Sequence, residues 1–223
     1  MTNLKLRREI IATALAMNEL RINRGKSGNV SARVAGGFLV TPSGLAYEST
    51  RPEDIVAVSL DSKAKGRRAP SSEWRFHRDV YSERPEIAAI VHAHSPFATT
   101  LACLCRGIPA FHYMIAIAGG PDIRCAPYAT FGTQELSDHA LTALEGRRAC
   151  LLANHGMIAV GDSLASALAL AVEVEALAEQ YWRALQIGEP VILPEDEMAR
   201  VLEKFRTYGR PAQSSAGRHR RRA

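Results

Sequence analysis

Two histidines separated by one residue, His92 and His94, are the residues of this sequence whose spacing best suits chemistry. On a β-strand, residues two apart project from the same face, so both imidazoles can reach one point. A third imidazole, His155, lies in an apolar segment that is expected to be a strand, and a carboxylate, Glu73, stands where a helix is expected to begin. Three neutral imidazoles and a carboxylate suit Zn²⁺, or another divalent transition metal such as Mn²⁺ or Co²⁺, better than Mg²⁺ or Ca²⁺.

The alternative interpretation is that these histidines belong to the core and form hydrogen bonds with the backbone, because spacing alone does not bring the four side chains together. Two further histidines, His77 and His139, fit helix faces and are interpreted as structural or solvated.

A second group of residues consists of small hydroxyl side chains and glycines, in the segments Ser27–Asn29, Thr41–Gly44 and Ser71–Ser72. Such loops allow backbone N–H groups and hydroxyls to converge on an anion, and a helix that begins near Ser72 adds its positive end. The pattern therefore suggests a phosphate site. Taken singly, each segment also fits an ordinary turn.

The elements that must position these residues follow from hydrophobic periodicity and turn signals. Helices are expected over 5–24, with Gly25 as the C-cap, and over 96–104, 133–144 and 163–186, with one more starting at Ser71–Glu73 under a capping hydroxyl. Strands are expected over 29–34, 38–41, 55–60, 87–94, 123–128 and 150–160. Because strands and helices mix without strict alternation, we expect an α/β fold: a single-domain layered fold with a central, mostly antiparallel sheet flanked by helices.

Composition excludes several classes of protein. The chain has 223 residues, 47% of them apolar and 23% charged, which is enough for one sizeable core. Four of the arginines that contribute to the net charge of +5 lie in the last six positions. The rest of the sequence therefore carries nearly balanced charge and does not suggest a nucleic-acid surface. No apolar run is long enough for a membrane span and no signal peptide is visible, so we expect no membrane association and a cytoplasmic location. The four cysteines do not have disulfide or zinc-knuckle spacing and are expected to be reduced and buried.

Several motifs together resemble the class II aldolase/adducin family. They occur in the order and spacing typical of that family and are Gly28–Ser31, Thr41–Gly44, Ser71–His77, His92-x-His94, Ile108–Ile115, Ala126–Thr133, Asn154–Gly156 and Glu203–Gly209. The resemblance is closest to the members that cleave L-fuculose 1-phosphate. It extends to about Gly209, so we expect one catalytic domain over 1–209 and a disordered basic tail over 210–223.

The resemblance also implies roles for individual residues. It places Glu73, His92, His94 and His155 at the family's zinc ligands, and it places Gly28, Asn29, Ser43, Gly44, Ser71 and Ser72 at the pocket for the substrate phosphate. Tyr113 falls where the family brings a tyrosine from a neighbouring subunit of a C4 homotetramer, with active sites at subunit interfaces. Phe131 and Tyr208 fall near the aldehyde end of the substrate. Lys26 departs from the family's small hydroxyl residue, and it could contact the phosphate or narrow the pocket.

The activity that the resemblance implies is reversible cleavage of a ketose 1-phosphate into dihydroxyacetone phosphate and an aldehyde. Candidate substrates are L-fuculose 1-phosphate and, in salvage of by-products of S-adenosylmethionine chemistry, 5-deoxyribulose or 5-methylthioribulose 1-phosphate. Glu73 would shuttle a proton at the nucleophilic carbon, and Tyr113 would act as general acid or base on the aldehyde side. The alternatives are a ketose-phosphate 4-epimerase, a methylthioribulose-1-phosphate dehydratase, or a non-catalytic interaction module like the adducin heads.

Overall fold

The computed structural model describes residues 2–207. The expected basic tail over 210–223, and Tyr208, lie outside the described residues.

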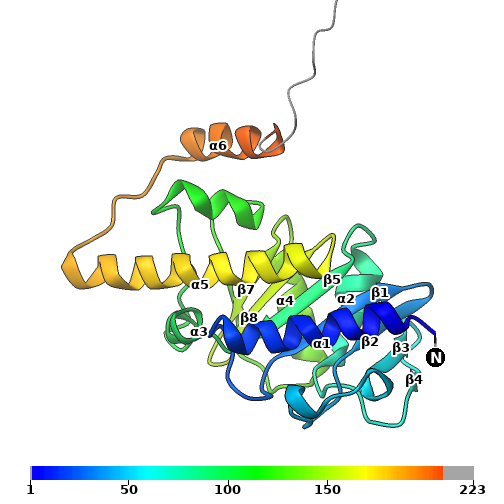
Figure 1. Ribbon diagram of the computed structural model, residues 1–223. Coiled ribbons are helices and arrows are strands. Elements are labelled where there is room, and N and C mark those ends of the chain that lie inside the picture. Colours follow the sequence, from blue (N-terminus) through cyan, green and yellow to red (C-terminus); the bar gives the residue numbers. More distant parts are fainter. Residues whose placement is uncertain (1, 208–223) are drawn as a thin grey trace, which may run out of the picture.

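One sheet of eight strands forms the centre of the molecule (Figure 1). Its order is β4-β3-β2-β1-β5-β8-β7-β6, and every neighbouring pair is antiparallel except β6 and β7. The strands are β1 Asn29–Val34, β2 Gly37–Val40, β3 Val56–Ser59, β4 Ala64–Lys65, β5 Ala89–Ala93, β6 Cys125–Ala126, β7 Ala149–Leu152 and β8 Gly156–Gly161. The prediction of a mostly antiparallel sheet flanked by helices is confirmed.

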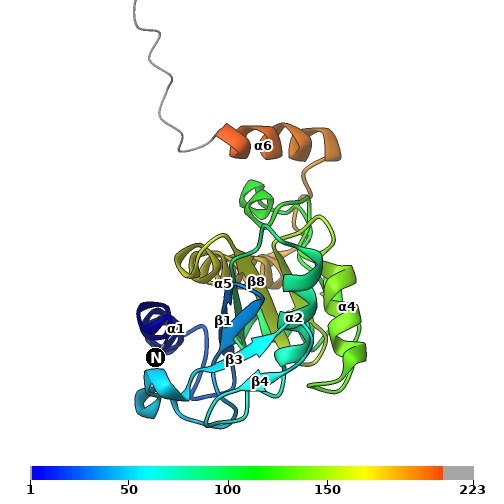
Figure 2. The ribbon, with the colours of Figure 1, turned by 90° about the vertical axis from the view of Figure 1, so that its right-hand side faces the viewer.

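Helices cover both faces of this sheet. Their bounds are α1 Leu4–Glu19, α2 Trp74–Glu83, α3 Pro96–Ala102, α4 Gln134–Leu144, α5 Leu164–Ile187 and α6 Glu195–Thr207, with 3-10 helices η1 Tyr47–Ser49, η2 Pro52–Asp54 and η3 Tyr113–Ala118. Figure 2 shows α1 and α5 on one side of the strands and α2 and α4 on the other. Each side has its own apolar core. Helix α6 packs on η3, which in turn packs on α5.

Strands β1 and β5 place polar side chains in the layer beneath α2. Because side chains alternate along a strand, Val30 and Val91 point to the α1/α5 side, whereas Ile90 points to the α2/α4 side. Asn29 lies directly opposite His92 in the β1–β5 pairing, so both share the α2 side with Ile90. This layer therefore buries polar groups beside Phe76 and Val80.

Several expected boundaries are wrong. Helix α1 ends at Glu19, with Leu20 rather than Gly25 at its C-cap, because the chain turns at Arg21 with φ +61°. The N-cap of α2 is Glu73, and no hydroxyl side chain caps this helix.

The strand expected over 150–160 is two strands, β7 and β8, joined by a turn. Asn154 has φ +55° in this turn and His155 follows it, so His155 does not lie on a strand. The expectation of buried cysteines holds only for Cys150, because Cys103 and Cys105 are exposed. Helix α6 and strand β4 were not predicted. Within residues 2–207, no helix combines the length and apolar character that a membrane span requires.

Candidate active site

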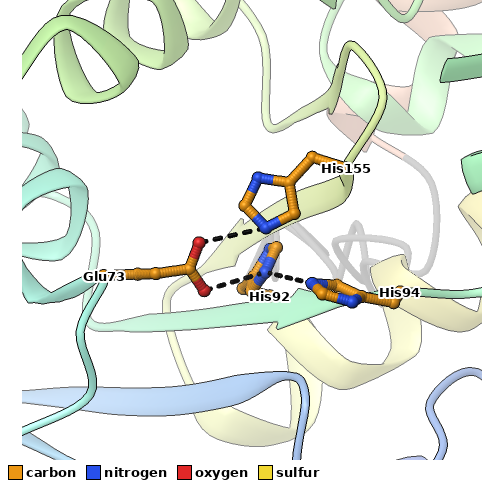
Figure 3. Close-up of side chains that lie close together, drawn as sticks. All are labelled: Glu73, His92, His94 and His155. Atoms are coloured by element: carbon orange, nitrogen blue, oxygen red, sulfur yellow. Dashed lines mark hydrogen bonds and ion pairs between the residues drawn. The ribbon is translucent and has the colours of Figure 1, made fainter. Parts of the chain in front are cut away.

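Four side chains from three parts of the fold meet at one point, as Figure 3 shows. Glu73 comes from the start of α2, His92 from β5, His94 from the residue after β5, and His155 from the β7–β8 turn. One donor atom from each residue lies within 4.8 Å of the donors of the other three. The structure thus brings together the four residues that the sequence analysis singled out as candidate metal ligands.

The three imidazoles surround a common point almost symmetrically. The ring centroids of His92, His94 and His155 are 4.9 Å apart in every pair, with interplanar angles of 74° to 77°. Glu73 completes the group, since its Oε2 lies 3.1 Å from Nε2 of His92 and its Oε1 lies 3.0 Å from Nε2 of His155. The geometry is that of three nitrogens and one oxygen directed inward.

Three features prepare these groups to act as ligands. Nδ1 of His92 lies 2.8 Å from the carbonyl oxygen of Met157, to which it donates, and this bond leaves the lone pair of Nε2 facing the cluster. Burial, with the nearby imidazoles of His92 and His155, lowers the pKa of His94 to about 3, so His94 is neutral. Burial alone would raise the pKa of Glu73, but the neighbouring imidazoles lower it, so this carboxylate is ionised.

The cluster fits a divalent cation. The buried Oε1 of Glu73 accepts no hydrogen bond of good geometry, despite the 3.0 Å between this oxygen and His155. Nε2 of His92 and Nε2 of His94 approach to 3.0 Å, with ring nitrogens turned toward each other. Unpaired buried polar atoms are costly, and a shared cation would satisfy these donors at once. Three imidazoles with one carboxylate are ligands that zinc and its first-row neighbours accept.

The segments with small hydroxyl residues lie beside this cluster and are tied to one another. Asn29 Nδ2 donates to Glu73 Oε2 at 2.9 Å. The backbone N–H of Ser71 donates to the carbonyl of Thr41 at 3.0 Å, and that of Ser43 donates to Ala69 at 3.1 Å. These bonds hold the loop over 41–44 against the loop over 69–72, whose last residue precedes Glu73.

Two glycines and a lysine complete the arrangement of these loops. A Cβ on Gly28 would lie 2.5 Å from the carbonyl oxygen of His92, so only glycine allows the chain to enter β1 this close to β5. Gly44 has φ +69°, which favours glycine in the turn that follows Ser43. The Lys26 ammonium donates to the Gly44 carbonyl at 2.9 Å and is otherwise exposed.

A cavity of about 370 Å³ opens onto Glu73, His94 and His155. Its other lining residues are Ser27, Ser72, Tyr128, Ala129, Phe131 and Asn154. Phe131, expected near the aldehyde end of a substrate, is therefore at the cavity and 65% exposed. Tyr113 does not line the cavity of its own chain, and its side chain is 51% exposed at the start of η3.

Sequence reasoning did not single out Ser27, Tyr128 and Asn154 as individual site residues, although all three lie within or beside the quoted motifs. It also missed Tyr47, whose hydroxyl donates to the carbonyl of Gly28 and holds the entry to β1. Tyr47 is alone in its segment, and no spacing signal could have found it.

Comparisons with known proteins agree with this geometry. The sequence-family model for the class II aldolase and adducin N-terminal domain matches residues 8–182 of this chain. A protein of Rhodospirillum rubrum named 5-methylthioribulose-1-phosphate/5-deoxyribulose-1-phosphate aldolase is 60% identical over 212 residues, which cover 95% of this chain and 96% of that protein. The L-fuculose phosphate aldolase of Escherichia coli is 51% identical over 206 residues, with 92% and 96% covered. A solved structure named L-fuculose 1-phosphate aldolase superposes with a TM-score of 0.89 at 42% identity and covers 92% of this chain and 98% of its own.

Proposed function

The chain belongs to the class II aldolase and adducin family, and on this premise we propose that it is a metal-dependent aldolase that reversibly cleaves a ketose 1-phosphate into dihydroxyacetone phosphate and an aldehyde. The observation that carries the proposal is the convergence of Glu73, His92, His94 and His155 at the wall of a cavity. A non-catalytic module would have no need for four metal-ligand side chains at one point with a buried carboxylate oxygen of Glu73 left without a hydrogen bond.

Under this proposal, the three histidines hold the metal and Glu73 is both a ligand and a proton carrier. Zn²⁺ is the ion that three imidazoles and a carboxylate suit best, with Mn²⁺ or Co²⁺ as alternatives. When bound, such an ion supplies positive charge to the carbonyl and hydroxyl oxygens of the substrate. Glu73 is ionised, so it can accept the proton from the carbon of dihydroxyacetone phosphate that forms the new bond, and can return it in the cleavage direction.

The phosphate of the substrate would bind between the three loops beside the cluster. Asn29, Ser43, Gly44, Ser71 and Ser72, with the backbone at Gly28, would supply uncharged N–H and O–H donors. Lys26 lies on the same loops and brings a positive charge to them. The bond from Asn29 to Glu73 supports this assignment, because it puts the phosphate loops and the proton carrier in direct contact.

We further propose a homotetramer whose active sites lie at subunit interfaces. Tyr113 supports this part of the proposal, because a half-exposed tyrosine away from its own cavity is free to reach the cavity of a neighbouring chain. There it would exchange the proton of the hydroxyl on the aldehyde side. Phe131 lines the part of the cavity that would contact the aldehyde, and Tyr208 belongs to the same proposal.

For the substrate, we favour 5-deoxyribulose 1-phosphate and 5-methylthioribulose 1-phosphate over L-fuculose 1-phosphate. The relative that carries the first two names shares 60% of its residues with this chain, against 51% for the fuculose relative. The exposed rings of Tyr128 and Phe131 at the cavity also suit an aldehyde part that carries only a methyl or methylthio group, without the extra hydroxyl that L-fuculose 1-phosphate has there. This choice would place the enzyme in the salvage of by-products of S-adenosylmethionine, in the cytoplasm.

The experiment is to incubate the purified protein, loaded with Zn²⁺, with each of the three ketose 1-phosphates and to measure released dihydroxyacetone phosphate with a coupled dehydrogenase. We expect release of dihydroxyacetone phosphate, with the highest kcat/KM for the two ribulose derivatives. If an epimer or a dehydrated product formed without dihydroxyacetone phosphate, the protein would be an epimerase or a dehydratase rather than an aldolase. A protein without stoichiometric metal and without turnover would favour an interaction module.

A further inference from the structure

Five buried side chains form a row of hydrogen bonds that runs from the hydroxyl of Tyr81 to the carboxylate of Glu73. Tyr81 Oη lies 2.8 Å from Ser31 Oγ, which lies 2.6 Å from Nδ1 of His77. Nε2 of His77 lies 2.5 Å from Oδ1 of Asn29, whose Nδ2 lies 2.9 Å from Oε2 of Glu73. None of these five side chains is more than 5% exposed. Bulk water therefore does not substitute for any of these bonds.

The ionised carboxylate of Glu73 fixes the direction of the hydrogen bonds nearest to it. An ionised carboxylate only accepts, so Asn29 must turn its NH₂ group to Glu73 and its carbonyl oxygen to His77. That oxygen only accepts, so Nε2 of His77 must carry the hydrogen.

The remaining links follow from the charge of His77. Burial, with the nearby His92, lowers the pKa of His77 to about 3, so this ring is neutral and its Nδ1 accepts the hydroxyl proton of Ser31. The Ser31 oxygen then accepts from the hydroxyl of Tyr81.

The ring of His77 is also held in its plane. It stacks on Phe76, with ring centroids 4.5 Å apart, and on Phe38, with centroids 6.2 Å apart. Neither neighbour offers a polar atom, so the two ring nitrogens meet only Ser31 and Asn29 among the hydrogen bonds of the described residues.

We propose that His77 is a positioning residue that uses its Nε2–H to keep the amide of Asn29 from flipping. In a flipped amide, the carbonyl oxygen of Asn29 would face the carboxylate of Glu73, and the NH₂ group would no longer be available to that carboxylate or to a phosphate. The inference rests on the proposed function, since Asn29 and Glu73 have catalytic value only in an aldolase. It replaces the interpretation of His77 as merely structural.

Two variants of similar size separate this role from packing. The amide nitrogen of glutamine can occupy the position of Nε2, so His77→Gln keeps a donor for Asn29, whereas asparagine reaches only the position of Nδ1, so His77→Asn keeps only the contact with Ser31. We expect His77→Gln to retain kcat/KM within about threefold, and His77→Asn to lose about 10- to 100-fold, with a raised KM for the ketose phosphate. Equal losses in both variants, or a loss in kcat alone that follows the folded fraction, would overturn the proposal.

Tyr81→Phe is the control at the far end of the row. It removes the hydroxyl and leaves the bonds from Ser31 to Glu73 in place, so kcat/KM should stay within about threefold of the original. A loss as large as that of His77→Asn would mean that packing of the whole layer, rather than the Asn29 amide, controls activity, and would overturn the proposal.

A spectroscopic measurement tests the inference without catalysis. In long-range ¹H–¹⁵N spectra of the zinc-loaded protein, with ¹⁵N in its histidine rings and the His77 signals assigned by their loss in His77→Gln, we expect the neutral Nε2–H tautomer between pH 5 and about pH 8. An Nδ1–H tautomer or a charged ring would overturn the proposal. If the original protein cleaves no ketose 1-phosphate, the proposed function fails, but the tautomer is still measured, so the two failures are distinguishable.

Discussion

In the proposed aldolase, the carboxylate of Glu73 is both a metal ligand and the proton carrier, and a single substitution separates the two roles. In Glu73→Gln, an amide replaces the base while three imidazoles remain to hold the ion. We expect kcat to fall about 10²- to 10⁴-fold, the usual contribution of a general base. Elemental analysis should still find one equivalent of metal per chain.

The matched control is Glu83→Gln, at the opposite end of the same helix and exposed to solvent, which should change neither kcat nor metal content. If Glu73→Gln lost its metal together with its activity, the glutamate would be mainly a ligand and the proton carrier would have to be sought elsewhere.

At the same scale, Lys26 is the residue that brings positive charge to the loops that are proposed to bind the phosphate. Its ammonium is within 2.9 Å of the Gly44 carbonyl and exposed, so it can turn to a phosphate oxygen without breaking a buried bond. We expect Lys26→Met to raise the KM for the ketose phosphate about tenfold with little change in kcat, because one charge-assisted hydrogen bond is worth about 1.5 kcal/mol.

Inhibition by inorganic phosphate should weaken by a similar factor in Lys26→Met, which steady-state kinetics can measure. Lys65→Met, on the exposed strand β4, is the control. An unchanged KM would assign Lys26 a role in closing the loop rather than in binding the anion.

Among the elements, the segment that leads into the loop over 69–72 is held in place by a buried carboxylate. Asp54 at the end of η2 accepts from the backbone N–H of Arg51 and from the guanidinium groups of Arg67 and Arg68. Burial alone would raise the pKa of Asp54, but these donors lower it. Asp54 thus ties η2 to the chain that continues into Ser71.

Replacement of Asp54 by asparagine should therefore lower the free energy of unfolding by about 1–2 kcal/mol, toward the low end for charged hydrogen bonds because both arginine side chains are half exposed. A carboxyl whose pKa is lowered by folding contributes stability above its unfolded pKa of about 3.9 and loses it as the pH falls. Urea unfolding should thus show a gap between the original and Asp54→Asn at pH 7 that shrinks below about pH 4.

The exposed Asp61, paired with Lys63, is the control for this prediction, and Asp61→Asn should leave the stability unchanged. A gap for Asp54→Asn that stayed constant down to pH 3 would show that its ion pairs contribute little.

The elements also show how far the sequence determines the fold. The β-branched run around Ile90 and Val91 was enough to predict β5, and Ser163 to predict the start of α5. The turn at Asn154 could not be predicted from the sequence, because the apolar residues on either side of it have the pattern of a single strand. Helix α6 was missed although its apolar residues Met198, Val201, Leu202 and Phe205 recur at helical spacing and pack against the core, so the sequence carried a signal for it.

For the site, the sequence supplied the residues and their chemistry but not their convergence. His92 and His94 could be paired from their spacing alone. The placement of His155 beside them depends on the antiparallel pairing of β5 with β8, a contact between segments more than sixty residues apart. Local patterns do not report such pairings, so the ligand chemistry of the four residues could suggest a metal site, but their convergence could be expected only from the family resemblance.

At the scale of the whole molecule, the proposal that Tyr113 acts in a neighbouring subunit predicts complementation between inactive variants. Glu73→Gln and Tyr113→Phe should each be nearly inactive alone. If each site takes Glu73 from one chain and Tyr113 from the next, chains unfolded together and refolded in equal amounts should regain about a quarter of the original activity, because one random pairing in four joins an intact Glu73 to an intact Tyr113.

The oligomeric state of the mixture is checked by light scattering, and each variant refolded alone is the control. No recovery in a mixture that forms mixed oligomers would show that Tyr113 does not act across an interface.

The ligand atoms of the candidate cation site are spread over a long stretch of the chain, from the start of α2 to the β7–β8 turn, and they join the helical layer to the sheet. During synthesis, the group therefore remains incomplete until the ribosome has released the turn that carries His155. A bound ion would hold the two layers together, so its binding energy would add to the stability of the folded protein against heat. Metal supply in the cell would then govern how long each copy survives as well as how fast it turns over.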